Sequence, residues 1–134
     1  MQQTQMTLMV DWGDIDALGH VNNLALMRYV QAARVHYFES VGLMVGAGQA
    51  EGPILVHIAC RFLVPVFYPD TVQVHTRAKH LGTTSLVLAH SLYNEKGACV
   101  AQAEDVLVYF AYAKNEKRPW PHRLREAIVQ MGIG

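Results

Sequence analysis

Ten residues near the amino terminus, Asp14 to Asn23, combine the side-chain types that acyl chemistry uses. Two carboxylates, a glycine, a histidine and two asparagines directly precede a long apolar segment. Asparagine caps helices well, and the unsatisfied N–H groups at a helix start carry about half a positive charge. An oxyanion is stabilised there, and a nearby carboxylate can deliver oxygen to a carbonyl carbon. The segment therefore predicts a site for acyl chemistry at the start of a helix.

The two carboxylates are expected to differ in role. A single residue separates Asp14 from Asp16, so in an extended chain their side chains point the same way. Two neighbouring negative charges repel each other, which predicts a raised pKa for one of the two carboxyl groups. For Asp14 we favour a loop carboxylate that accepts backbone N–H groups. Asp16 is the chemical candidate, because Gly19 permits a sharp turn or a close ligand approach just before the helix. His20 can either polarise a carbonyl or hold the loop.

The rest of the chain supplies the elements that position this segment. A long helix is predicted at Leu24–Glu39, where 11 of 16 residues are apolar, with Asn22 or Asn23 as its cap and Gly42 after its end. Its polar residues share one arc, so other structure should cover the remaining sides. They are Arg28, Gln31, Arg34 and Glu39.

Alternating apolar and polar residues predict strands on both sides of this helix. One short strand precedes it and four follow, with a terminal helix at the end. This order predicts an α+β fold in which an antiparallel sheet curls around one helix and keeps open edges that a second copy can pair with. The predicted ranges are Met6–Val10, Ile54–Val64, Thr71–His80, Ser85–Tyr93 and Ala98–Tyr112 for strands and His122–Met131 for the helix.

Composition restricts the partners and the compartment. The 134 residues are predicted to form one domain, 1–134, in which 51% of residues are hydrophobic and 16% are charged. So apolar a chain predicts that some surface faces another subunit. A formal net charge of zero without a basic cluster argues against nucleic acid as a partner, and no apolar run is long enough for membrane insertion.

The cysteines indicate the compartment, and the histidines bear on metal binding. Cys60 and Cys99 are isolated and predicted to be reduced core residues, which together with the lack of a signal peptide predicts a cytoplasmic protein. The seven histidines show no metal-ligand spacing, and no G-x-S-x-G elbow is present. We therefore expect no metal and no cofactor.

At this point the residues resemble a known family. Val10–Asn23 resembles the D-x-D-x-x-G-H-V-N-N signature of hotdog-fold acyl-CoA thioesterases of the 4-hydroxybenzoyl-CoA thioesterase type. Further family-like patterns follow in the same order, so the resemblance covers the whole domain. Ala25 and Leu26 depart from it, because a tyrosine often follows the asparagines there, and the shape of the acyl pocket is not transferable. The later patterns are Cys60–Pro65, Tyr68–Asp70, Leu81–Ser85 and Lys117–Pro121.

The resemblance implies a hotdog fold, with a curved antiparallel sheet of about five strands wrapped around a long central helix. It also implies a homodimer with a continuous sheet, often a homotetramer of two dimers, and hydrolysis of an acyl-CoA thioester to free acid and CoA. Asp16 corresponds to the catalytic carboxylate, and a backbone N–H near Asn23 polarises the carbonyl. The predicted site residues are Asp16, His20 and Asn23 for catalysis and Gly19, Val21, Asn22, Gly82, Thr83 and Ser85 for substrate binding.

Other features of the substrate are open at this stage. The acyl group is expected in an interface groove near Tyr29, Val30 and Ile54. Two other functions compete: a non-catalytic acyl-thioester-binding protein, which would release no thiol, and a hotdog enoyl-CoA hydratase or dehydratase, which would convert an enoyl-CoA without thiol release. The candidate contacts for the CoA phosphates are Arg61, Lys79, Lys114 and Lys117.

Overall fold

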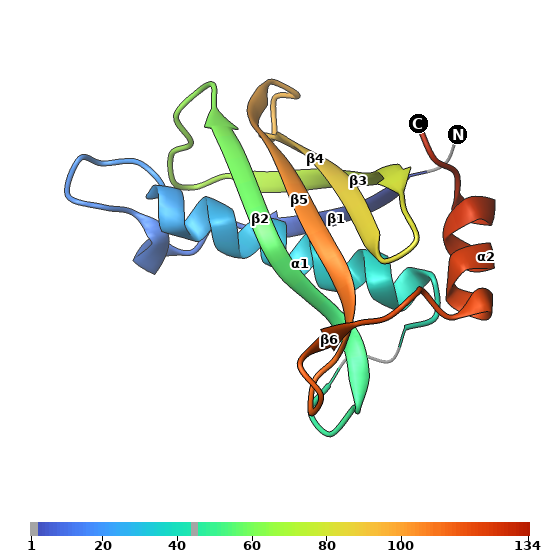
Figure 1. The fold of residues 1–134 in the computed structure, drawn as a ribbon. Helices are drawn as coiled ribbons and strands as arrows, with labels where there is room; N and C mark the ends of the chain where they lie inside the picture. The colour runs from blue at the N-terminus through green and yellow to red at the C-terminus, as the bar shows by residue number, and fades with distance from the viewer. Residues whose placement is uncertain (1–2, 44–45) are drawn as a thin grey trace.

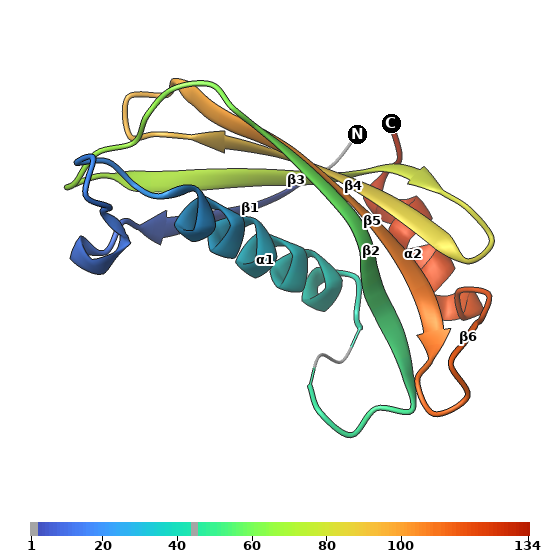
Figure 2. The same cartoon turned by 60° about the vertical axis from the view of Figure 1, so that its left-hand side comes forward.

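A computed structural model describes residues 3–43 and 46–134, in which a curved sheet carries one long helix on its concave face (Figure 1, Figure 2). The sheet has six strands in the order β1-β3-β4-β5-β2, every pair is antiparallel, and β6 pairs with β5. The elements are β1 (Thr4–Met9), a 3-10 helix (Trp12–Asp14), α1 (Asn23–Ser40), β2 (Glu51–Phe62), β3 (Thr71–Leu81), β4 (Ser85–Tyr93), β5 (Cys99–Ala111), β6 (Glu116–Lys117) and α2 (His122–Met131).

The predicted α+β order is confirmed, and most predicted bounds lie within one or two residues of the observed ones. The clearest differences are in β2, which begins at Glu51 rather than Ile54, and in β6, which was not predicted. Glu51, Gly52 and Pro53 therefore precede the predicted strand but belong to the observed one. Proline is tolerated here because β2 is an edge strand, paired on one side only with β5.

The core lies between α1 and the concave face of the sheet. Inward residues alternate along β3 and β4, as the sequence pattern predicts, and they are at most 1% exposed. α1 packs against β1, β3 and β4, so the sheet covers one side of the helix, while Leu24 is 71% exposed. The inward residues are Val72, Val74, Thr76, Ala78, Leu86, Leu88, His90 and Leu92.

The prediction that Arg34 lies on the polar, solvent-facing stripe of the helix is wrong. Its side chain is only 13% exposed, and Arg34 Nε donates to Asp105 Oδ2 at 2.8 Å. The reason is a carboxylate on β5, 71 residues away in the chain, which lies fully buried under this part of α1. A buried charge is retained when it is paired and hydrogen-bonded.

Asp105 also joins the strands beneath the helix. His90 Nε2 lies 2.7 Å from Asp105 Oδ2, and His90 Nδ1 lies 2.7 Å from Thr76 Oγ1. Because an ionised carboxylate only accepts, His90 donates to Asp105. Burial alone would raise the pKa of Asp105, but the hydrogen bonds from His90 and Arg34 hold that pKa below its usual value. One buried network therefore connects α1, β3, β4 and β5.

Replacing Asp105 with alanine should lower the free energy of unfolding by about 3–5 kcal/mol at neutral pH, because Arg34 and His90 lose their buried partner. The depressed pKa contributes stability above the unfolded-state value and loses it as the pH falls through the folded-state value. Urea unfolding at pH 7 and at pH 3 should therefore show a smaller difference from wild type at pH 3.

Glu104→Ala is the matched control for this change. Glu104 is the adjacent residue, but its ion pair with Lys79 is about half exposed on both sides. Such pairs contribute at most about 1 kcal/mol. Equal losses in the two variants would contradict a stabilising role for the buried network.

Candidate active site

The residues between β1 and α1 form a closed loop. Ile15 and Val21 make an isolated antiparallel bridge at its base. Within the loop, Asp16 N–H donates to the His20 carbonyl at 3.0 Å, and Gly19 N–H donates to the Asp16 carbonyl at 3.0 Å. Gly19 has φ 91°, a conformation that favours glycine, so the predicted sharp turn is confirmed.

The start of α1 lies directly after this loop. Asn22 is the N-cap, because its Oδ1 accepts the Ala25 N–H at 2.8 Å, which confirms one of the two predicted caps. Asn23 and Leu24 are the first two helical residues, and helix geometry gives their N–H groups no acceptor inside the helix. These groups form the positive end of the helix.

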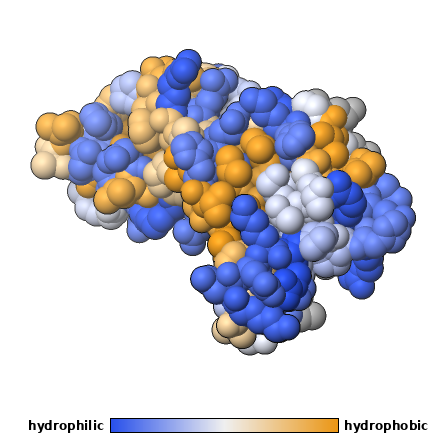
Figure 3. Space-filling model, in the orientation of Figure 1, coloured by the Kyte–Doolittle hydropathy of each residue, from blue (hydrophilic) through white to orange (hydrophobic). Residues whose placement is uncertain are grey.

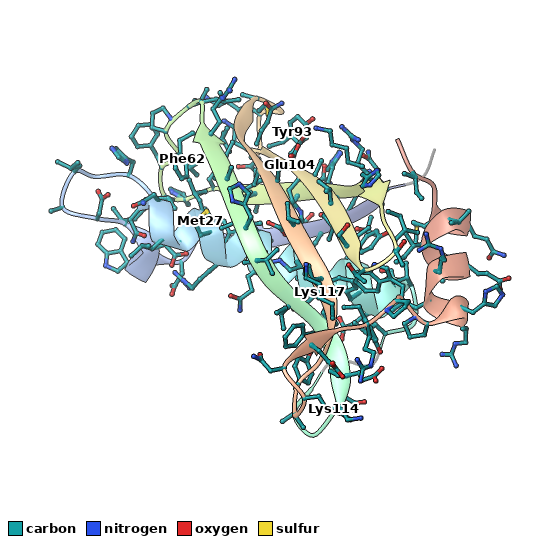
Figure 4. All side chains as sticks on the ribbon, in the orientation of Figure 1. Met27, Phe62, Tyr93, Glu104, Lys114 and Lys117 are labelled. Carbon is teal, nitrogen blue, oxygen red and sulfur yellow. The ribbon has the colours of Figure 1, made fainter. Side chains whose placement is uncertain are left out.

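A groove of about 410 Å³ brings the loop and the helix start together. Four predicted site residues line it: Asp16, His20, Val21 and Asn23. The opposite wall is the segment that follows β2, and Figure 4 shows Phe62 near that end of the strand. The complete lining is Asp16, Leu18, His20, Val21, Asn23, Leu26, Phe62, Leu63, Val64, Pro65 and Val66.

The carboxylate of Asp16 is held at one oxygen only. Leu18 N–H donates to Asp16 Oδ1 at 2.8 Å, and Oδ2 has no protein partner within the described ranges. Asp16 is half-buried, whereas Asn23 is exposed. The free oxygen can therefore accept a proton from a water or attack a carbonyl carbon in the same groove that the helix start faces.

His20 and Asn22 are positioned by different contacts. The His20 ring meets the Phe67 ring edge to face, with centroids 6.3 Å apart. The Asn22 side chain is occupied at both ends, because Nδ2 donates to the Asp14 carbonyl while Oδ1 caps the helix. Val21 N–H donates to the Val66 carbonyl at 2.8 Å, which fixes the loop against the segment after β2.

The expected like-charge pairing of Asp14 and Asp16 is wrong. Asp14 ends a 3-10 helix instead of an extended segment, so the two side chains do not follow the two-residue rule. The Asp14 side chain is buried, accepts the Tyr29 hydroxyl at 2.5 Å and the Asp11 N–H at 3.1 Å, and forms an ion pair with Arg28. Burial would raise its pKa, but hydrogen bonds from Tyr29 and Arg28 hold the pKa of Asp14 below its usual value.

The other predicted substrate-binding residues lie elsewhere in the chain. Gly82, Thr83 and Ser85 form the β3–β4 turn, at the opposite end of β3 from the Asp16 loop (Figure 1). This turn is held by the carboxyl-terminal segment, since Trp120 N–H donates to the Thr83 carbonyl at 3.1 Å and its indole N–H to the Ser85 carbonyl at 3.0 Å. A single chain therefore does not bring this turn to the groove.

The candidate acyl and phosphate contacts are also dispersed. Tyr29 and Val30 are core residues, 4% and 0% exposed, so they do not line the groove. Lys114 and Lys117 lie near β6, far along β2 from Phe62 (Figure 4). Sequence reasoning missed the wall from Leu63 to Val66, whose only signal was the family-like pattern that ends at Pro65.

Two further findings concern binding chemistry and membranes. Among the described residues, no three His, Cys, Asp or Glu side chains could hold a metal ion together. Cys60 and Cys99 are both free and half-buried rather than fully in the core. In the part of the chain that the structure describes, no helix has the length and apolarity to cross a membrane.

Comparisons with known proteins identify the family and the fold. The model of the thioesterase-like superfamily matches residues 10–128. The chain is similar to the PA2801 protein of Pseudomonas aeruginosa, which has been proposed to be a thioesterase, with 38% identity, TM-score 0.88 and coverage of 95% of this chain and 99% of that one. A mutant 4-hydroxybenzoyl-CoA thioesterase in complex with 4-hydroxybenzoyl-CoA shares the fold, at 21% identity and TM-score 0.86 over 96% and 99% of the two chains. The uncharacterised protein YsmA of Bacillus subtilis is 21% identical over 90% of this chain and 81% of its own length.

Replacing the cap residue Asn22 with alanine should lower the free energy of unfolding by about 1 kcal/mol, because the first turn of α1 loses its side-chain acceptor. The measurement is urea unfolding followed by circular dichroism. Asn23→Ala is the matched control, since Asn23 is exposed and makes no described side-chain hydrogen bond, and its effect should stay within about 0.5 kcal/mol. A larger loss for Asn23 than for Asn22 would show that the cap is assigned to the wrong residue.

Proposed function

Because the chain belongs to the thioesterase-like superfamily, we propose that it is an acyl-CoA thioesterase that hydrolyses an acyl-CoA thioester to a free acid and CoA in the groove beside Asp16. One observation carries this proposal. A carboxylate with a free oxygen and a helix start with free N–H groups line the same groove. The carboxylate delivers oxygen to the carbonyl carbon, and the N–H groups stabilise the negative charge that develops on the carbonyl oxygen. Thioester hydrolysis requires both.

The reaction begins when the thioester carbonyl oxygen lies against the N–H groups at the start of α1, near Asn23. Asp16 then acts in one of two ways: it takes a proton from a water that attacks the carbonyl carbon, or it attacks the carbon itself and forms a mixed anhydride that water hydrolyses. In both cases the negative charge that develops on the carbonyl oxygen faces the positive end of α1.

Departure of CoA needs little help from an acid. Thiols have pKa values of about 8.5, so the thiolate leaves without prior protonation when the C–S bond breaks. His20, on the same groove, donates a hydrogen bond to the carbonyl in this scheme. Val21 lines the wall against which the thioester lies, while Gly19 holds the loop in shape and Asn22 caps the helix start.

Asp16→Asn should reduce kcat by about 10³-fold while leaving the unfolding transition in place, because the amide keeps the shape of the side chain but neither attacks nor takes a proton. The assay is release of free CoA thiol from a panel of acyl-CoA and carrier-protein thioesters. Glu95→Gln makes the same charge change at an exposed hairpin turn and should keep wild-type turnover. Near-normal turnover in Asp16→Asn would remove Asp16 from the mechanism.

We further propose that the working unit is a homodimer formed along β2. This strand pairs with β5 on one side only, and its free edge is 12 residues long. Leu55, Val56 and Phe62 are 41%, 53% and 48% exposed, and hydrophobic atoms are visible along this strand in Figure 3. A long apolar edge strand is a template for pairing with another chain. A homotetramer of two such dimers is the alternative assembly.

In the proposed dimer, the β3–β4 turn of one subunit lies close to the groove of the other subunit. Ser85 pairs with Val108, and Val108 pairs with Ile54, so the turn and the start of β2 lie in one row across the sheet. If two β2 strands pair in antiparallel orientation, the start of one lies beside the end of the other. Gly82, Thr83 and Ser85 of one subunit then approach the groove of its partner, where they contact the pantetheine arm.

Val56→Asp should convert the assembly into monomers, because a charge on the paired edge is costly to bury. Sedimentation velocity gives the mass of each species, and thiol release should fall together with the loss of the dimer. Val129→Asp, on the exposed face of α2, is the matched control, since Val129 is 55% exposed and lies away from β2. A monomeric wild type with full activity would contradict the dimer.

A cytoplasmic location completes the proposal. Both cysteines are free thiols, as expected in a reducing compartment. Acyl-CoA is the proposed partner, and neither nucleic acid nor membrane insertion enters the scheme.

A further inference from the structure

The carboxylate of Asp14 does not line the groove, yet it makes three contacts with other residues. It is only 4% exposed. One oxygen pairs with Arg28, and the other accepts the Tyr29 hydroxyl at 2.5 Å and the Asp11 N–H at 3.1 Å. Arg28 and Tyr29 belong to the second turn of α1, so this carboxylate attaches the beginning of the loop to the helix.

The backbone of Asp14 attaches the end of the same loop. Its carbonyl accepts the Asn22 N–H at 3.0 Å and the Asn22 side-chain N–H at 3.1 Å. Asn22 in turn caps α1 through Ala25. A single residue therefore holds both ends of the segment from Ile15 to Val21 against the first two turns of the helix.

Asp16 has no such attachment of its own. Its described hydrogen bonds go to Leu18, Gly19 and His20, all within the loop. The loop can be regarded as one small unit that carries Asp16. Its place relative to the N–H groups of α1 then depends on what holds the base of the loop: Asp14 attaches it to α1, and the Val21 N–H attaches it to the segment after β2.

We propose that Asp14 is a positioning residue that fixes the Asp16 carboxylate opposite the start of α1 and thereby controls turnover rather than substrate affinity. The inference rests on the proposed thioesterase function. Displacement of a reacting group by about 1 Å can cost about 100-fold in rate. A loosened loop base should therefore lower kcat and leave KM nearly unchanged, because the groove walls formed by the segment after β2 stay in place.

The test compares Asp14→Asn with Asp105→Asn. Both replace a buried, ion-paired carboxylate, but Asp105 lies under the middle of α1 and makes no contact with the loop. Thiol-release kinetics are measured well below both unfolding transitions. Asp14→Asn should lose about 100-fold in kcat with KM changed less than about threefold, whereas Asp105→Asn should retain wild-type kcat.

Tyr29→Phe provides a milder variant in case Asp14→Asn does not fold. It removes one donor to Asp14 and keeps the ring in the core, and it should lower kcat in the same direction by a smaller factor. Wild-type kcat in a folded Asp14→Asn, or equal losses in Asp14→Asn and Asp105→Asn, would overturn the proposal.

Amide hydrogen exchange separates this inference from the proposed function. The Gly19 N–H donates within the loop and the Asn22 N–H donates to the base of the loop, so both amides should exchange faster in Asp14→Asn than in wild type. The amide of Val74, in the buried part of the sheet, should exchange at the wild-type rate. Asp105→Asn should leave the loop amides unchanged. A wild type that releases no thiol would refute the thioesterase, while loop exchange unaffected by Asp14→Asn would refute the positioning role.

Discussion

The proposed mechanism requires the start of α1 to remain open, and the loop that precedes the helix leaves it open. A helix leaves its first N–H groups without internal acceptors, and a protein normally covers them with side chains or water. Here Asn22 satisfies the Ala25 N–H, while Asn23, whose N–H has no acceptor inside the helix, lines the groove. The loop before the helix folds back on itself instead of covering them. The positive end of α1 is thus available to a ligand, with Asp16 beside it.

Two buried carboxylates attach α1 to the rest of the structure, at two different points along the helix. Asp14 attaches the loop to the second turn of α1, and Asp105 attaches the middle of α1 to the sheet through Arg34. Buried ion pairs contribute little net stability compared with apolar packing, but removing one partner is costly. Their roles differ by position: Asp14 attaches the loop at the start of α1, and Asp105 attaches the middle of the helix to β3, β4 and β5.

Local patterns in the sequence were enough to predict α1, α2 and most strands, because burial alternates every two residues in strands and follows the helical period in α1. The Asn22 cap and the Gly19 turn also follow from local chemistry. The burial of Arg34 was not predicted, because its partner Asp105 is 71 residues away in the chain. The side-chain direction of Asp14 was not predicted either, because Asp14 lies in a 3-10 helix and the two-residue rule assumes an extended chain. Contacts set by the tertiary fold are not encoded in local spacing.

The sparseness of the groove fits a thioester better than an oxygen ester. Asp16 is the single carboxylate in its lining, and apolar residues make up most of the rest. An alkoxide leaving group would need a proton from a second acid, whereas a thiolate with a thiol pKa of about 8.5 does not. In the proposed mechanism, one carboxylate that delivers oxygen and one helix end that binds the oxyanion are therefore sufficient for this substrate class. The apolar wall from Phe62 to Val66 lies at the carboxyl end of β2, the strand along which we propose that the second subunit pairs.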